Sequence, residues 1–144
     1  MYSSKLSVSV HILCVVALGS LPVTSEKIAG SIGTNPALVR RLMGRLKAAN
    51  LVEARTKLGA TGLAKPAEQI SLLDVFRAAE PQQALFDLHT GTNPECPVGA
   101  NICRILTQFY TGAQRELEAA LERVKLSDIL RELPPALEST TRPD

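Results

Sequence analysis

The most reactive side chains of the chain lie in one short run, NPECPVGANICRIL, at residues 93–106. Cys96 and Cys103 supply two thiols there, and His89 lies seven residues before Cys96. Thiolates and imidazoles ligate zinc and iron–sulfur clusters, and a thiolate of low pKa is readily oxidised. Cysteine is also a small apolar residue that is often simply buried. Metal binding, redox sensing and packing are therefore all open for this run.

A metal site needs more ligands than this run supplies. Cys96 and Cys103 make half of a four-ligand set, His89 is the nearest candidate for a third ligand, and a homodimer could share ligands across its axis. Structural zinc usually binds closer pairs of the form C-x2-C. We therefore predict no metal, and keep Cys96, Cys103 and His89 as the alternative set.

A redox role requires fewer side chains than a metal site. Cys96 precedes Pro97 and a helix expected to begin near Ala100 or Asn101, so the helix dipole would favour the thiolate. Oxidation would give a sulfenic acid and then a disulfide. The second thiol is Cys103, if the two Cα atoms come within about 7 Å, or the symmetry mate in a dimer. We predict Cys96 and Cys103 as redox-sensing residues.

The third cysteine, Cys14, falls within an apolar helix and is expected to pack there. An odd number of cysteines without regular spacing argues against a disulfide scaffold and for a reducing compartment, so the cytoplasm is expected. The apolar stretch at residues 8–21 includes Ser9 and His11, and it is shorter than the roughly 18 residues of a membrane span. We predict no signal peptide and no membrane contact.

Composition indicates a mainly α fold without an enzyme site. Hydrophobic residues make up 45% of the 144 but aromatic residues only 3%, so the core must be built from aliphatic side chains on helices. The sequence contains no Gly-rich phosphate loop and no Ser/His/Asp arrangement around a nucleophile turn. We predict that the protein is not an enzyme.

Positive charge is concentrated in one segment. Residues 24–65 carry a net charge of +6, and the remainder of the chain carries −4. Such asymmetry indicates a surface for a polyanion.

That basic segment has the pattern of a helix-turn-helix followed by a hairpin. The helix SEKIAGSIG, capped by Thr24 or Ser25, ends at Gly33, and a second helix begins with Asn35 as its cap. Small residues between basic ones on the second helix would let it approach a DNA groove closely. After it, residues 51–66 are β-prone around a Gly-containing turn, with Arg55, Lys57 and Lys65 expected at or near the tip.

A long helix is predicted from residue 101 onward. Apolar residues recur there every three or four positions over more than six turns, which is more apolar surface than one short neighbouring helix can bury. We predict dimerisation through this helix. Residues 134–144 contain three prolines and no periodicity, so a disordered tail is expected.

The runs SEKIAGSIGTNPALVRRLMGRLKAANLVEA and GLAKPAEQISLLDVFRAAE, followed by a cysteine-bearing loop and a long helix, resemble the Rrf-two family of bacterial winged helix-turn-helix regulators. The resemblance covers about residues 1–130 and implies a homodimer that binds a partly palindromic DNA operator. The predicted DNA-contacting residues are Ser3, Ser4, Lys5, Ser25, Asn35, Pro36, Ala37, Arg40, Arg41, Arg45, Lys57, Gly59 and Thr61. Cluster-binding members carry three cysteines in the loop and following helix, whereas this chain has two there. We therefore predict no cofactor, with an iron–sulfur cluster as the alternative.

The sequence thus predicts a mainly α protein in four parts. These are a winged helix-turn-helix domain at 1–85, with its wing at about 51–66, a cysteine-bearing sensor loop at 86–100, a long dimerisation helix and short terminal helix at 101–133, and a tail at 134–144. The predicted function is a homodimeric DNA-binding repressor that responds to redox or nitrosative state through Cys96. The alternatives are an iron–sulfur or metal-dependent regulator and a winged-helix protein-interaction module.

Overall fold

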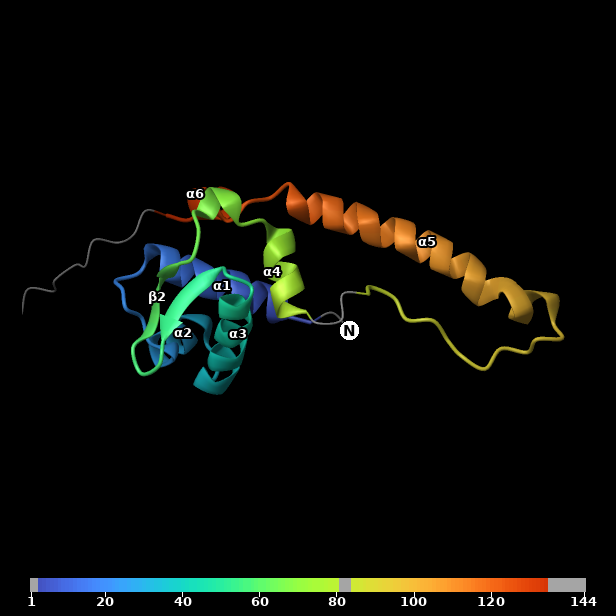
Figure 1. Cartoon of the computed structure of the whole chain (residues 1–144), viewed down its shortest axis with the longest axis horizontal. Coiled ribbons are helices and arrows are strands. Elements are labelled where there is room, and N and C mark those ends of the chain that lie inside the picture. Colours follow the sequence, from blue (N-terminus) through green and yellow to red (C-terminus); the bar gives the residue numbers. More distant parts are fainter. Residues whose placement is uncertain (1–2, 81–83, 135–144) are drawn as a thin grey trace, which may run out of the picture.

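The computed structural model describes residues 3–80 and 84–134, which form a helical body and one long helix that extends away from it (Figure 1). The predicted tail at 134–144 lies outside the described residues except for its first residue. Among the described residues no helix is both long and apolar enough to span a membrane. The elements in chain order are α1 (Lys5–Leu18), α2 (Ser25–Ile32), α3 (Pro36–Ala48), β1 (Val52–Arg55), β2 (Gly59–Leu63), η1 (Ala67–Gln69), α4 (Leu72–Ala79), α5 (Pro97–Glu122) and α6 (Leu126–Glu132).

The body is built around α1, which is apolar on nearly every face, as its sequence predicted. Ile12, Leu13 and Val16 are almost completely buried, and Cys14 is buried beside them. Helices α2, α3, α4 and α6 and strand β2 all contact α1. The core they enclose is aliphatic, as the low aromatic content required; its largest fully buried side chains include Ile28, Val39, Leu42, Leu46, Leu51, Ile70, Val75 and Leu126.

Local capping determines the helix-turn-helix. The Thr24 side chain accepts a hydrogen bond from the backbone N–H of Lys27 at 3.3 Å, so Thr24 rather than Ser25 caps α2. Gly33 ends α2 in the left-handed conformation, with φ of 80°. Asn35 Oδ1 then accepts from the N–H of Leu38 at 2.9 Å, and Pro36 occupies the first turn of α3. The predicted caps of α3 are confirmed.

Strands β1 and β2 form the predicted antiparallel hairpin, the wing, with a register shift between Glu53 and Ala54. Two backbone hydrogen bonds join Val23 to Ala60, at 3.0 and 2.8 Å, and attach the wing to the segment before α2. The expected position of Lys65 is wrong: it lies beyond β2, and its ammonium group is 3.9 Å from the carboxylate of Asp74. The chain has already left the hairpin at that point.

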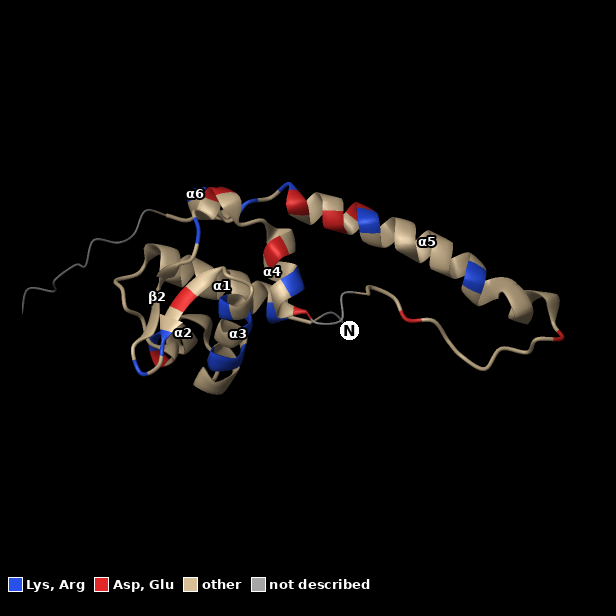
Figure 2. Cartoon of the chain, in the orientation of Figure 1, with Lys and Arg blue, Asp and Glu red and all other residues tan. Residues whose placement is uncertain are grey.

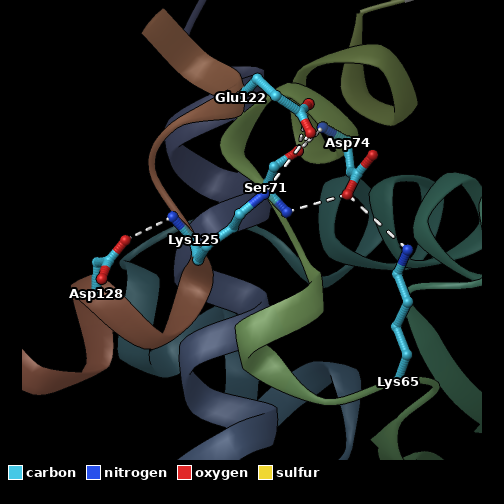
Figure 3. A network of polar contacts seen from close by, with 6 residues as sticks. All are labelled: Lys65, Ser71, Asp74, Glu122, Lys125 and Asp128. Carbon is cyan, nitrogen blue, oxygen red and sulfur yellow. Dashed lines mark hydrogen bonds and ion pairs between the residues drawn. The ribbon is translucent and has the colours of Figure 1, made fainter.

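The turn between α5 and α6 is joined to the start of α4 by backbone and side-chain bonds. The N–H of Leu72 donates to the carbonyl of Val124 at 2.9 Å, and the N–H of Leu126 donates to the carbonyl of Ile70 at 2.8 Å. Buried Ser71 caps α4 in a reciprocal capping box with Asp74. Figure 3 shows the Ser71 hydroxyl also donating to Glu122 at the end of α5, over 3.3 Å. We call these contacts the α4–α5 junction.

Helix α5 has 26 residues, and none of them is buried. It begins at Pro97, so the expected start near Ala100 or Asn101 is wrong, and residues 97–100 are helical rather than part of the predicted loop. Proline suits the first helical turn because that turn leaves its N–H groups unpaired. Residues 84–96, called here the cysteine loop, run outward from the body alongside α5 (Figure 1). The rings of Phe86 in this loop and Tyr110 on α5 lie 5.0 Å apart.

Gly59 provides a test of how the wing is attached to the body. Its φ is 89°, and a Cβ atom there would lie 2.2 Å from the carbonyl oxygen of Val23. We expect Gly59→Ala to lower the free energy of unfolding by about 2–3 kcal/mol, because both the backbone strain and the clash oppose folding. Urea denaturation followed by circular dichroism measures the change.

The matched control for that variant is Gly30→Ala. Gly30 lies exposed in α2 with open space around its missing side chain. Alanine there should stabilise the protein by about 0.5–1 kcal/mol through helix propensity. Equal effects of the two variants would contradict the close approach of Gly59 to Val23.

Candidate nucleic-acid interface and thiol site

An open groove of about 430 Å³ lies between α3, the start of α2 and the wing. We call it the α3–wing groove. Its walls come from three elements that are far apart in the sequence, and the helix-turn-helix and the Val23–Ala60 bridge hold them together. The residues that line it are Thr24, Ser25, Glu26, Arg40, Met43, Gly44, Lys47, Ala54, Arg55, Thr56, Lys57 and Gly59.

Four basic side chains line this groove. Arg40 and Lys47 come from α3, and Arg55 and Lys57 come from the wing. All four are exposed, and Figure 2 shows the basic residues gathered on α3 and the hairpin loop. Lys57 has a positive φ of 71°, which places it in the tight turn at the wing tip. The groove is therefore an electropositive surface that matches the charge of a DNA backbone.

The structure brings together only some of the predicted DNA-contacting residues. Ser25, Arg40, Lys57 and Gly59 line the groove itself. The start of α3 exposes Asn35, Ala37 and Arg41 and leaves Pro36 half-buried. Ser3, Ser4 and Lys5 lie outside the groove at the amino end of α1, where the Ser3 hydroxyl accepts from the N–H of Lys5 at 3.1 Å.

Two further predicted residues, Arg45 and Thr61, make hydrogen bonds inside the protein. The guanidinium of Arg45 donates to the carbonyl of Ala79 at the end of α4, over 2.9 Å, and so ties α3 to α4. The hydroxyl of Thr61 donates to the carbonyl of Glu53 across the wing, over 3.2 Å. Neither residue lines the groove.

Three residues that line the groove are not among the predicted DNA-contacting residues: Glu26, Lys47 and Arg55. Lys47 could have been found, because it lies seven residues after Arg40 and so on the same face of α3. Glu26 is one of the two acidic residues in the basic segment at residues 24–65. Nothing in its spacing shows that its carboxylate lies 3.3 Å from the Arg40 guanidinium.

The thiol of Cys96 lies at the amino end of α5, as its N-cap residue. The backbone N–H groups of Gly99 and, to a lesser extent, Val98 lower the pKa of this fully exposed thiol. Asn93 folds tightly over the same turn: a Cβ atom on Gly99 would be 2.4 Å from the Asn93 carbonyl oxygen. Cys96 is therefore an accessible thiol whose pKa lies below that of an ordinary cysteine.

The other two cysteines have different surroundings. Cys103 is half-buried on α5, and its sulfur lies 3.4 Å from the backbone carbonyl of His89, to which the thiol donates. Cys14 is buried in α1, and that burial raises the pKa of its thiol. Cys14 therefore has the packing role expected for it.

A disulfide between Cys96 and Cys103 within one chain is incompatible with helix α5. Seven residues at about 1.5 Å rise each separate the two Cα atoms by roughly 10 Å along the helix. A disulfide needs Cα atoms within about 7 Å. The intact helix therefore excludes Cys103 of the same chain as a disulfide partner of Cys96. The other predicted partner, the symmetry mate in a dimer, remains.

Comparison with known proteins shows what this arrangement belongs to. The family described as Rrf2, iron-dependent transcriptional regulator, matches residues 2–132. YwnA of Bacillus subtilis (strain 168), named as an HTH-type transcriptional regulator, is 38% identical over 133 residues, which is 92% of this chain and 99% of YwnA. The chain belongs to the Rrf2 family. It is therefore a transcriptional regulator with a DNA-binding fold, and it is not an enzyme.

Solved structures show the same Rrf2 architecture. IscR of T. potens superimposes with a TM-score of 0.66 at 22% identity, covering 92% of this chain and 87% of IscR. CymR of B. subtilis, described as the global cysteine regulator, gives a TM-score of 0.64 at 17% identity, covering 93% of this chain and 98% of CymR. The winged helix-turn-helix and the long helix that follows it are therefore confirmed as the fold.

The description of the Rrf2 family as iron-dependent raises the question of whether this chain can hold iron. Within residues 3–80 and 84–134, no three His, Cys, Asp or Glu side chains lie together as metal ligands. His89 meets Cys103 through its backbone carbonyl, which accepts from the thiol. The described residues of one chain therefore do not by themselves supply the ligands that an iron–sulfur cluster or a mononuclear metal needs.

The α3–wing groove predicts a specific effect of Lys57 on DNA binding. Lys57→Gln should weaken binding to all DNA sequences about equally and reduce the slope of log affinity against log salt by about 0.9, because one phosphate contact is lost. Fluorescence anisotropy with a labelled duplex at several salt concentrations measures both effects.

Lys65→Gln is the matched control for Lys57→Gln. It removes the same charge from the same segment, but Lys65 lies outside the groove beside Asp74. Its salt slope should equal that of the wild type. A larger effect of Lys65 than of Lys57 would show that DNA binds elsewhere.

Proposed function

We propose that this Rrf2 protein is a cytoplasmic homodimer that represses transcription by binding a specific DNA operator, and that oxidation or nitrosation of Cys96 changes this binding. The observation that carries the proposal is the α3–wing groove, where four basic side chains converge on a helix-turn-helix and its wing. A cytoplasmic location follows from its partner, which is DNA, and agrees with its three free thiols.

Recognition of DNA would follow the geometry of a winged helix. Helix α3 enters the major groove, where its small residues Ala37 and Gly44 allow a close approach and Arg40 and Arg41 can reach base edges. The wing tip lies beside α3, and Lys57 there contacts the phosphate backbone. In this scheme Arg40 and Arg41 give sequence specificity, and Lys57 gives affinity for DNA of any sequence.

Dimerisation would cover the long helix. None of the 26 residues of α5 is buried, and its large apolar side chains include Val98 at 66% and Phe109 at 70% exposure. An apolar stripe of this length in water is unfavourable by about 25 cal/mol for each Å² left exposed. A second copy of α5 packed against it buries both stripes and presents two copies of α3 to DNA.

The proposed chemistry at Cys96 begins with its thiolate. The sulfur attacks a peroxide oxygen, the O–O bond breaks, and water leaves after protonation, so that the thiol becomes a sulfenic acid. A second thiol then displaces water from this sulfur and forms a disulfide. Because Cys103 of the same chain is about 10 Å away along α5, the second thiol is the symmetry mate of Cys96 in the dimer or a small-molecule thiol.

Oxidation at Cys96 would act on DNA binding through the dimer. A bulkier or bonded sulfur at the N-cap disturbs the first turn of α5 and the Asn93 turn packed against Gly99. The two copies of α3 must match half-sites about 34 Å apart or a multiple of that distance. A change in how the two long helices pack alters this spacing and removes one half of the contacts.

The direct test of the function is selection of bound sequences from a pool of random duplex DNA. Under the proposal, the wild-type protein enriches a partly palindromic sequence, because a two-fold dimer binds two equal half-sites. Failure to enrich any sequence, with intact folding, would instead favour a protein-interaction role for the winged helix.

Phe109→Asp tests the dimer. A charge in the middle of the apolar stripe should raise the dimer dissociation constant at least about 30-fold, since a buried aromatic anchor typically contributes about 2 kcal/mol or more. Sedimentation equilibrium measures the constant. Gln108→Asp adds the same charge at the neighbouring exposed position, about 100° around the helix, and should have little effect.

Cys96→Ser tests the sensor. Wild-type protein treated with mild peroxide should lose operator binding and recover it with a reductant, whereas Cys96→Ser should bind equally in both conditions. Cys103→Ser is the matched control and should respond like the wild type. Because the pKa of Cys96 is lowered, the midpoint of its rate of alkylation by iodoacetamide against pH should lie below that of an ordinary exposed thiol.

A wild-type protein whose operator binding is unchanged by peroxide and by a nitric-oxide donor would contradict the sensor role. The same result would leave DNA binding through α3 intact.

A further inference from the structure

An ion pair links the two helices of the helix-turn-helix on the DNA side of the protein. Nη1 of Arg40 on α3 lies 3.3 Å from Oε1 of Glu26 in the first turn of α2. Both side chains are more than half exposed, at 57% and 67%. The contact therefore joins a predicted base-contacting residue to a carboxylate that the predicted function does not use.

Glu26 is the one acidic residue among those that line the α3–wing groove. Arg40, Lys47, Arg55 and Lys57 share the groove with it. A carboxylate at this place repels phosphate and cancels one of the four positive charges, so it lowers the affinity for DNA of any sequence. An effect other than affinity must offset that loss.

A gain in folding stability does not offset this loss of affinity for DNA. An ion pair exposed to this degree contributes little to folding, because water screens the charges and the long side chains lose conformational freedom. The carboxylate itself is well placed, since it lies in the first turn of α2, where the helix dipole favours negative charge, and Thr24 caps the same turn. Glu26 thus places a carboxylate at an electrostatically favourable position within reach of the Arg40 guanidinium.

The remaining effect of Glu26 is on the orientation of the Arg40 side chain. A free arginine side chain can reach many phosphate oxygens, whereas recognition of guanine requires its planar guanidinium in one place and one plane. The bond to Glu26 restricts where the guanidinium can lie before DNA arrives, so less conformational freedom is lost when it meets the correct base. Competing contacts with nearby phosphates become less favourable.

We propose that Glu26 is a positioning residue that sets the sequence specificity of this regulator by holding the Arg40 guanidinium for one base edge and away from the phosphate backbone. The proposal rests on the proposed binding of DNA through α3. It assigns to α2 a role in specificity, although α2 itself does not enter the DNA groove.

The test compares two duplexes, the selected operator and a scrambled sequence of the same length, by fluorescence anisotropy at several salt concentrations. We expect Glu26→Gln to bind the scrambled duplex more tightly and to steepen its salt slope by up to about 0.9, because the freed arginine contacts an additional phosphate. The ratio of operator to scrambled affinity should fall about 10-fold, within the range of one lost bidentate base contact. Thermal unfolding should shift by no more than a few degrees.

Glu53→Gln is the matched control, because Glu53 is exposed on the wing strand β1 and does not line the groove. Its specificity ratio should equal that of the wild type. Arg40→Gln completes a double-mutant cycle, in which Glu26→Gln should change the specificity ratio only while Arg40 is present.

The outcomes separate the two proposals. A specificity ratio that Glu26→Gln leaves unchanged, or changes as much without Arg40 as with it, overturns the positioning role of Glu26. A wild-type protein that binds both duplexes equally overturns the proposed function itself.

Discussion

The α4–α5 junction is the constraint on which the rest of the structure depends. Two backbone hydrogen bonds, from Leu72 to Val124 and from Leu126 to Ile70, join the end of the long helix to the helix-turn-helix body. Buried Ser71 adds a side-chain bond to Glu122 across 51 residues of sequence. These bonds prevent α5 from turning freely against the body. In the proposed dimer, the direction of α5 would therefore determine where each α3 lies.

The two ends of α5 have different surroundings. Cys96 caps its amino end, and the junction holds its carboxyl end, about 39 Å away for 26 helical residues. Oxidation at Cys96 therefore cannot act on α3 by direct contact. Under the proposed redox control, oxidation would act on the packing between copies of α5, and the junction would pass the resulting movement to the DNA-binding body. The exposed thiol would then control binding although it lies far from DNA.

Much of the fold could be predicted because its signals are local. Asn35, Pro36 and Gly33 determine the ends of their helices through their own caps and backbone preferences, and the structure confirms each of them. The apolar periodicity of α5 is equally local, so the sequence indicated its length well. Only its start was misplaced, because Pro97 fits both a loop and a first helical turn.

The features that could not be predicted depend on contacts between distant residues. Arg45 has the sequence context of a basic residue on a DNA-binding helix, but the end of α4 supplies a carbonyl at Ala79 that captures its guanidinium. Lys65 belongs to the basic segment by sequence, yet the chain has turned toward Asp74 when it reaches that residue. Glu26 meets Arg40 only because the turn after Gly33 folds α2 against α3. Charge and spacing alone contain none of this information.

The most direct test of the proposed dimeric DNA binding is a hydroxyl-radical footprint of the protein on its selected operator. Two copies of α3 held by paired α5 helices should protect two half-sites on one face of the duplex, about 10–10.5 base pairs apart from centre to centre or a multiple of that spacing. Protection of a single half-site, or of a continuous stretch without periodicity, would contradict a dimer that presents α3 and the wing to DNA.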